Sequence, residues 1–315
     1  MWDEDGPAVA RGIEVEPVVV VADRRTVPVG GEELHRHEVE EGLDVEPLLD
    51  GRRADDGRVV DERAVGALRR GDRDGVGVLV TTPLGRIRAG RVALATNAFK
   101  PLLKRMSHYI APVYDYCMVT EPLSNAQLAE IGWQLRQGLS DISNQFHYYR
   151  LTEDNRILWG GYDVIYYWRG RMNSELESRP ATWAKLSKNF FDTFPQLEGI
   201  KFTHTWGGAI DTCSRFCVFW GRGMQGRVAY SVGYTGLGVA ATRFGAEVML
   251  DILDGKRSKA TQTDFVKDKP IPFPPEPFRF IGIQATRWSL DREDRSGKRN
   301  LWLRTLDRFG LGFDS

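Results

Sequence analysis

The chain has 315 residues, with 43 basic against 43 acidic side chains. This length suits one large domain or two cooperating ones, and a zero net charge disfavours a basic nucleic-acid-binding protein. No apolar run approaches the roughly 20 residues that cross a bilayer, and the acidic start of the chain does not resemble a secretory signal. Three cysteines are too few for a disulfide scaffold. We therefore expect a cytoplasmic protein with no nucleic-acid or membrane partner.

The neutral total hides two unlike pieces. Residues 1–75 carry 20 acidic and 11 basic side chains, whereas the remainder carries 23 acidic and 32 basic ones. The first 96 residues contain no Ser, Asn, Gln, Lys, Phe, Tyr or Cys, and Trp2 is their only aromatic residue. A segment so charged buries too little apolar surface to offset the entropy of ordering it. We predict an acidic leader over 1–75 that is disordered or weakly ordered.

A second interpretation of this leader stays open. GC-rich DNA translated out of frame yields a similarly restricted set of residues, so 1–75 need not be a genuine N-terminus. Within the leader, apolar runs favour a strand over 17–22 and a short helix over 59–68. His35 and His37 lie in a charged run without metal-ligand spacing, and we predict no metal site there.

From residue 76 onward the pattern is typical of a packed α+β protein. Short apolar runs, several of them alternating with polar residues, are bounded by Gly, Pro and Asn, as in strands joined by tight turns. Two of these runs flank the turn 152–155 and predict a hairpin. The small residues at 96–98 suit a helix entry. The expected strands, in chain order, are 78–82, 86–89, 91–96, 109–121, 146–151, 156–160 and 227–232.

Helix signals follow in three places. Ser124 and Gln127 have the spacing of a capping box, which opens a short helix. Pro180 is a favourable first residue of a second helix, and Pro195 stops it. The apolar face of this second helix consists of Trp183, Leu186, Phe190 and Phe194. The tail 299–313 also has helical spacing, after an extended linker over 270–277.

Residues 227–255 combine a strand, a glycine turn and a helix that ends before Gly255. Such a turn presents free backbone N–H groups that suit a phosphate, a carboxylate or the carbonyl edge of a flavin. The glycines can equally serve only to permit a tight turn, and the acidic residue of a dinucleotide fingerprint is missing. The residues alone leave both interpretations open. The expected apolar face of the helix is Val239, Phe244, Val248, Ile252 and Leu253.

Four segments together resemble one known family. They are 92–99 (VALATNAF), 156–163 with its double glycine, 206–212 (WGGAIDT), and the turn 233–238 with its helix. Their order and spacing resemble the D-amino-acid-oxidase-like (DAO) family of FAD-dependent oxidoreductases, gamma-glutamylputrescine oxidoreductase-like branch. The resemblance covers about 76–315, the C-terminal part of such an enzyme.

The resemblance implies an α+β remnant of a two-domain FAD-binding fold, with a βα cofactor part and an antiparallel β substrate domain. Residues 76–106 and 205–260 would be what remains of the FAD-binding domain. Residues 107–204 would form the substrate domain, and 261–315 a linker with a C-terminal docking helix. Nothing in 1–75 supplies the family's GxGxxG turn for the FAD pyrophosphate.

The resemblance also implies a cofactor, a substrate class and site residues. FAD is the implied cofactor, with contacts at Ala95, Thr96, Asn97, Gly233, Thr235, Gly236, Leu237 and Gly238. The implied substrate is a small-molecule amine or amino acid, held in an aromatic cage of His147, Tyr149, Trp159 and Tyr162. Aromatic rings suit a cationic amine, although alternating aromatic residues on a sheet are also typical of a core. No catalytic residue and no oligomeric state follow.

Three positions depart from the sarcosine oxidases of that family. Trp159 replaces the lysine that promotes reaction with oxygen, and Ala240 replaces the lysine that holds the substrate carboxylate. Trp206 stands near the cysteine that carries covalent flavin, which neither Cys213 nor Cys217 matches. These departures favour a dehydrogenase or a different amine substrate.

Two functions remain open: a truncated FAD-dependent oxidoreductase acting on a C–N bond, and a non-catalytic remnant or binding module that does not retain FAD.

Overall fold

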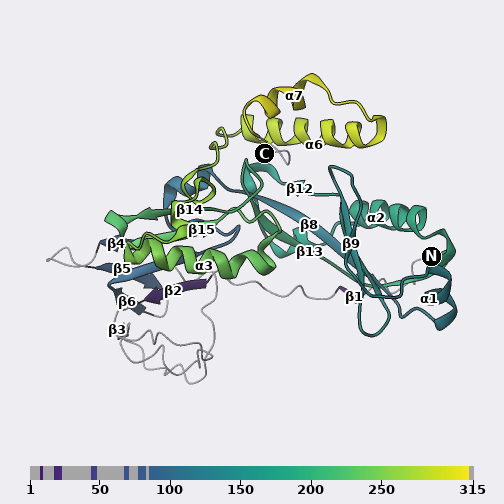
Figure 1. Ribbon diagram of the computed structural model, residues 1–315, viewed down its shortest axis with the longest axis horizontal. Helices are drawn as coiled ribbons and strands as arrows, with labels where there is room; N and C mark the ends of the chain where they lie inside the picture. Colours follow the sequence, from purple (N-terminus) through teal and green to yellow (C-terminus); the bar gives the residue numbers. More distant parts are fainter. Residues whose placement is uncertain are drawn as a thin grey trace. The chain divides into compact units, whose positions relative to one another are not determined.

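A computed structural model describes residues 8–9, 18–22, 44–47, 67–70, 77–82 and 85–311. The chain divides into two compact units. Of the described residues, 8–9, 111–210 and 273–311 belong to unit 1, and the others belong to unit 2. Mixed helix and sheet agree with the expected α+β class (Figure 1).

Unit 1 is built on a seven-stranded sheet. Its strands are β1 (Ala8–Val9), β8 (Ala111–Thr120), β9 (Leu139–Ser140), β10 (His147–Leu151), β11 (Ile157–Gly161), β12 (Ile165–Tyr166) and β13 (Phe202–Thr212). Their order is β1-β13-β8-β11-β10-β9, and β12 pairs with β8. The antiparallel hairpin β10–β11 and the long strand β8 confirm the strands predicted at 146–151, 156–160 and 109–121.

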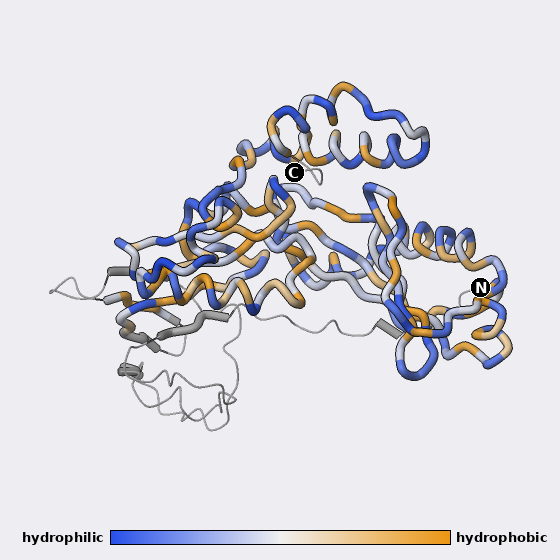
Figure 2. Tube along the Cα trace, in the orientation of Figure 1, coloured by the Kyte–Doolittle hydropathy of each residue, from blue (hydrophilic) through white to orange (hydrophobic). Residues whose placement is uncertain are grey.

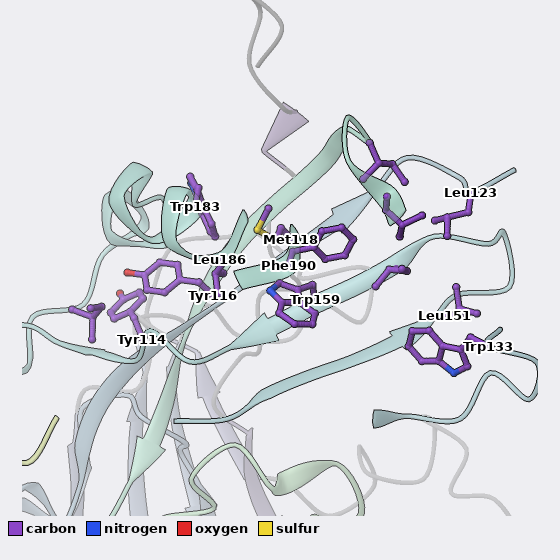
Figure 3. Close-up of a cluster of buried hydrophobic side chains, with 14 of the residues drawn as sticks. Tyr114, Tyr116, Met118, Leu123, Trp133, Leu151, Trp159, Trp183, Leu186 and Phe190 are labelled. Atoms are coloured by element: carbon purple, nitrogen blue, oxygen red, sulfur yellow. The ribbon is translucent and has the colours of Figure 1, made fainter. Parts of the chain in front are cut away.

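The core of unit 1 lies between this sheet and helix α2 (Pro180–Thr193). Trp183, Leu186 and Phe190 of α2 are buried against β8 and β11, as the apolar face predicted (Figure 3). Helix α1 (Asn125–Ile131) begins after Ser124 with both hydrogen bonds of the predicted capping box. These local signals were sufficient because each depends on residues at most four positions apart.

The C-terminal end of unit 1 agrees with the prediction in one helix and differs from it in another. Helix α7 (Leu301–Arg308) confirms the helical tail predicted over 299–313, whereas α6 (Phe278–Ser296), against which α7 packs, was not predicted. Sequence patterning missed α6 because only Ser289 of its 19 residues is fully buried. Figure 2 shows the pair mostly in the blue of hydrophilic residues, with scattered orange positions. Residues 270–275 of the predicted linker belong to no helix or strand, and 276–277 form a turn before α6.

Unit 2 contains two four-stranded sheets. Their strands are β2 (Val18–Ala22), β3 (Asp44–Pro47), β4 (Ala67–Arg70), β5 (Val78–Thr82), β6 (Gly85–Ala89), β7 (Arg91–Ala95), β14 (Phe219–Gly223) and β15 (Val228–Val232). One sheet has the order β14-β15-β7-β2, in which β15 and β7 are parallel, and the other has the order β3-β6-β5-β4. Helix α3 (Gly238–Asp254) packs on β14 and β15.

Shorter elements complete the described residues. Helices α4 (Lys259–Gln262) and α5 (Asp264–Lys267) follow α3. The 3-10 helices are η2 (Lys104–His108), η3 (Trp168–Gly170), η4 (Ser174–Glu177), η5 (Pro195–Leu197) and η6 (Met224–Gly226). In the part of the chain that the structure describes, no helix has the length and apolar character needed to cross a bilayer.

Two local predictions near the leader are wrong. Ala67 and Leu68 lie in strand β4 instead of a helix, because they pair with β5, while 59–66 are outside the described residues. The predicted helix entry at 96–98 is a turn, since Asn97 has φ +47° and such a backbone ends a right-handed helix. The strand predicted over 17–22 is confirmed as β2. Most of the leader, with its disordered and out-of-frame interpretations, lies outside the described residues.

The face of α3 agrees only in part with the prediction. Val248 and Leu253 are buried, whereas Val239 is fully exposed. Gly245 lies where α3 meets Tyr234, which precedes the helix, and a Cβ atom at this position would overlap the Tyr234 hydroxyl. The glycine therefore allows Tyr234 to pack against the helix.

The Gly245→Ala variant tests this contact. Alanine in a helix interior normally stabilises by about 0.5–1 kcal/mol relative to glycine. At position 245 we expect a loss of about 1–3 kcal/mol instead, because Tyr234 must move. Urea unfolding followed by tryptophan fluorescence measures the change. Gly282→Ala in α6 is the matched control: nothing lies within 4 Å of its added Cβ, so it should stabilise. Equal stabilisation by both variants would contradict the contact.

Candidate functional site

The double glycine of β11 lies at the centre of the sheet of unit 1. Gly160 pairs with Cys117 of β8 on one side and with Tyr148 of β10 on the other. A Cβ atom on Gly160 would come within 2.7 Å of the Cys117 sulfur and of the Tyr148 ring. Gly161 has φ +91°, and a Cβ atom there would collide with the Phe146 carbonyl oxygen. Both positions therefore require glycine, which gives a physical reason for the motif.

His147 of β10 stacks between two rings. Its ring centroid lies 4.3 Å from that of Trp159 and 4.9 Å from that of Tyr162. Nε2 lies 3.0 Å from Nδ2 of Asn189, and Nδ1 lies 3.3 Å from the Gly160 carbonyl oxygen. One tautomer satisfies both contacts: Asn189 donates to Nε2, and Nδ1–H donates to the carbonyl.

The surroundings keep the His147 ring neutral. Burial lowers the pKa of His147 to about 4, although the nearby Asp141 carboxylate acts in the opposite direction. Near neutral pH the imidazole therefore carries no charge. The neutral His147 ring packs against the rings of Trp159 and Tyr162, and it does not provide a positive charge.

The four predicted cage residues lie together, but on the side of the sheet that α2 covers. Trp159 is 1% exposed and packs against Phe190 (Figure 3). It also contacts Phe194. Tyr149 is half-buried against the same cluster, and Tyr162 is half-buried beside His147. These contacts place Trp159 in the core. Contact of the four residues with a substrate stays a prediction.

The opposite side of the same sheet carries a hydrogen-bonded group that the sequence analysis did not find. The Tyr148 hydroxyl donates to Asp115 Oδ2 over 2.7 Å and lies 2.9 Å from the Cys117 sulfur. Strand alternation could have indicated it, because positions 115 and 117 share one face of β8. The group needs Gly160, over which the Tyr148 ring passes.

Asp163, two residues after the double glycine, binds several cations. Its buried carboxylate pairs with Arg179, Lys185 and Arg287, and it also accepts a hydrogen bond from Thr182. Burial acts to raise the pKa of Asp163, but the Thr182 hydroxyl and the two cations Lys185 and Arg287 outweigh it and lower the pKa. The carboxylate joins α2 and α6 to the end of β11.

Unit 2 contains the glycine turn between β15 and α3. Gly233, Thr235 and Gly236 all have positive φ, from +52° to +84°. The Gly233 N–H donates to Asp211 Oδ2 over 2.6 Å, and the Thr235 N–H donates to the Asp211 carbonyl oxygen over 3.3 Å. No side chain caps the start of α3 at Leu237. Among the described residues no side chain occupies the first N–H groups of α3, so they can bind an acceptor.

The predicted cofactor residues lie at the carboxyl ends of β7 and β15, in the sheet β14-β15-β7-β2 of unit 2. Leu94 of β7 is in register with Tyr230 of the parallel strand β15. The carboxyl ends of these strands are therefore adjacent, and they lead into Ala95–Asn97 and into Gly233–Gly238 respectively. Thr96 is buried, and Leu237 is 60% exposed. Their contact with a cofactor stays a prediction, but the location is where open α/β sheets bind ligands.

Asp211 is a further residue that the sequence analysis did not single out for a role. Its side chain is buried at the end of β13, and burial raises the pKa of Asp211 from 3.8 to about 6. Hydrogen bonds from the backbone of the turn, first that of Gly233, oppose the increase. The carboxylate thus holds the turn from one side.

The raised pKa of Asp211 predicts a pH-dependent stability. The native protein binds this proton more tightly than the unfolded chain does, so the contribution of Asp211 to stability falls as pH rises from about 4 to about 6. Asp211→Asn removes the titration. We expect the free energy of unfolding of the wild type, measured relative to the variant, to fall by about 3 kcal/mol across this range. Urea unfolding at several pH values gives both curves, and parallel curves would contradict the assignment.

Metal binding finds no support among the described residues, which include no group of three His, Cys, Asp or Glu arranged to hold an ion. All three cysteines are free thiols. The Cys213 sulfur donates to the carbonyl oxygen of Cys217.

The chain is similar to known flavoenzymes. The family model FAD dependent oxidoreductase (DAO) matches residues 46–252. The probable oxidoreductase OrdL of Haemophilus influenzae is 31% identical over 185 residues, which are 56% of this chain and 39% of that protein. Gamma-glutamylputrescine oxidoreductase of Escherichia coli is 34% identical over 203 residues, 62% and 43% of the two chains. The chain thus spans less than half the length of these relatives.

Solved structures show the same fold. Glycine oxidase from Geobacillus kaustophilus aligns with a TM-score of 0.53 at 15% identity, over 67% of this chain and 53% of that one. L-proline dehydrogenase from P. horikoshii aligns with a TM-score of 0.51 at 19% identity, over 63% and 51%. The family match begins at residue 46, so the family resemblance extends further into the leader than the start at 76 that we expected. With two thirds of its residues matched by the family model, the chain belongs to the FAD dependent oxidoreductase (DAO) family.

Proposed function

We propose that this chain takes part in the FAD-dependent oxidation of a C–N bond in a small amine or amino acid. The family match over 46–252 carries the proposal. One relative is named a gamma-glutamylputrescine oxidoreductase, and structures of similar fold include a glycine oxidase and an iminodiacetate oxidase. Amines or amino acids are the chemical class that these names share.

The turn of unit 2 has a donor set that fits FAD. The free N–H groups at the start of α3 suit an anionic oxygen or the carbonyl edge of a flavin. Positive φ at Gly233, Thr235 and Gly236 turns the backbone sharply here, and Asp211 holds it from behind. The residues that would hold the cofactor are Ala95, Thr96, Asn97, Gly233, Thr235, Gly236, Leu237 and Gly238. Bound FAD would supply the acceptor for the hydride that leaves the substrate carbon.

The aromatic cluster of unit 1 supports an amine as substrate. Tyr149 and Tyr162 keep part of their surface exposed, whereas His147 and Trp159 are buried behind them. In the proposed arrangement the two tyrosines contact the substrate, and the other two rings fix their positions. An electron-rich ring face attracts an ammonium group, and Lys185 already lies 4.6 Å from the centroid of Tyr162.

A non-catalytic binding module of the same fold is the alternative. The sequence matches GxGxxG at 221–226, but this segment is the end of β14 together with η6, and it leads into the antiparallel strand β15. It does not lead from a strand into a helix N-terminus, so it does not form the family's pyrophosphate site. A protein that holds FAD only at the turn of unit 2 would bind it weakly or not at all.

The composition supports a cytoplasmic protein whose partner is a small molecule. The net charge is zero, and the three cysteines are free. We propose no nucleic-acid and no membrane partner on this basis. The number of subunits is open.

Titration of the purified full-length chain with FAD tests the cofactor proposal. We expect quenching of FAD fluorescence and an absorbance band near ~450 nm that stays with the protein after gel filtration. Asp211→Ala should weaken FAD binding about tenfold, because the turn loses the acceptor of the Gly233 N–H. Asp264→Ala, at the exposed start of α5, is the matched control and should leave it unchanged. A folded protein that leaves FAD fluorescence unquenched would support the binding module instead.

A further inference from the structure

Asp115, Tyr148 and Cys117 form a polar group on the side of the unit 1 sheet that faces away from α2. The Tyr148 hydroxyl is the centre of the group, since it contacts both other side chains. Cys117, Gly160 and Tyr148 occupy one row across β8, β11 and β10. The missing side chain of Gly160 is what lets the Tyr148 ring cross to β8. Such an arrangement is built into the fold and does not result from a chance surface contact.

The protonation states of Cys117 and Tyr148 leave Asp115 as the hydrogen-bond acceptor of this group. Burial raises the pKa of the Cys117 thiol to about 12, and burial together with the charge of Asp115 raises the pKa of Tyr148 well above its usual value. Both groups therefore stay protonated near neutral pH, and Cys117 is not a nucleophile. Tyr148 directs its proton to Asp115. Asp115 is therefore the acceptor at the end of this chain of hydrogen bonds, and a bound cation would favour its ionised form.

Asp115, which is half-buried, differs from the two buried carboxylates described above. Asp163 has three cations around it, and Asp211 accepts backbone N–H groups of a turn. Asp115 accepts one hydrogen bond from the Tyr116 N–H and one from Tyr148. Among the described residues, no Lys, Arg or His forms an ion pair with it. The residue as a whole is half-buried, and a ligand would reach its carboxylate from the side of the sheet that faces away from α2.

Burial without a cation makes this carboxylate costly. It raises the pKa of Asp115, although the hydrogen bonds from Tyr148 and the Tyr116 backbone act to lower it. A cation placed beside the carboxylate would relieve this cost, since buried charges are stable only when they are paired. An alkylammonium group has the right charge, and it donates up to three hydrogen bonds. A carboxylate ligand would be repelled at the same place.

We propose that Asp115 binds the ammonium group of an alkylamine substrate, with Tyr148 as a positioning residue that orients the carboxylate. The proposal rests on the oxidation of an amine proposed above and narrows its substrate class, but it places the ammonium group at Asp115 instead of in the aromatic cage, which lies on the opposite side of the sheet. The end of the substrate that reaches Asp115 is cationic, and an amino acid that presents its carboxylate there is rejected.

Calorimetric titration of the full-length chain at pH 7.5 tests this assignment with three probes. They are n-butylammonium chloride, the neutral 1-butanol of nearly the same shape, and sodium butyrate. We expect the ammonium probe to bind at least about tenfold more tightly than 1-butanol, the typical effect of one charge-assisted hydrogen bond. Butyrate should bind more weakly than either.

Variants of the polar group separate charge recognition from folding. Asp115→Asn should lose the preference for the ammonium probe while its affinity for 1-butanol stays unchanged, and Asp115→Glu should keep part of the preference. Tyr148→Phe should reduce the preference several-fold. Asp192→Asn is the matched control, because Asp192 lies exposed on α2 and pairs with Lys188. Circular dichroism confirms that each variant is folded.

The outcomes are distinct from those of the FAD experiment, because no flavin is needed to measure binding of the probes. A folded Asp115→Asn protein that still prefers n-butylammonium would overturn the proposal. Equal binding of n-butylammonium and 1-butanol by the wild type would overturn it too. Loss of the preference in Asp115→Asn and its retention in the control would support it, whether or not FAD binds.

Discussion

The space left by Gly160 and Gly161 in β11 is the constraint on which the candidate substrate region depends. With no side chain at 160, the Tyr148 ring crosses the strand and reaches β8. With φ +91° at 161, the backbone passes close to the Phe146 carbonyl oxygen, at the start of the strand that carries His147. A methyl group at either place would displace these contacts. One pair of glycines thereby shapes both faces of the sheet.

Asp163 and Asp211 are buried and Asp115 is half-buried, and these three carboxylates are stabilised in three different ways. Asp163 is neutralised by cations from α2 and α6, and its role is to connect elements of unit 1. Asp211 accepts hydrogen bonds from N–H groups of the turn before α3, and these bonds hold the backbone of the turn. Asp115 has a phenol and one N–H group as partners. Because Asp115 has no cationic partner among the described residues, it is the carboxylate best suited to a cationic ligand.

The sequence predicted elements whose signals are local. The capping box at Ser124, the β10–β11 hairpin and the buried face of α2 all follow from residues a few positions apart, and all were confirmed. Helix α6 was missed because it is mostly exposed and has a weak apolar pattern. The turn at Asn97 was predicted as a helix entry, because small polar residues suit both.

The sequence by itself determined the family, the strand-turn-helix at 227–255 and the likeness of 156–163 to a family motif, because these depend on the order of residues. Alternation along β10 and β11 also determined which residues share a face. Alternation could not determine which face of the sheet α2 covers. The position of α2 in the tertiary structure places Trp159 in the core and Tyr148 on the opposite side. Only the tertiary structure brought Asp115 to Tyr148 and Asp211 to Gly233, because residues 22 to 33 positions apart meet only when the chain folds.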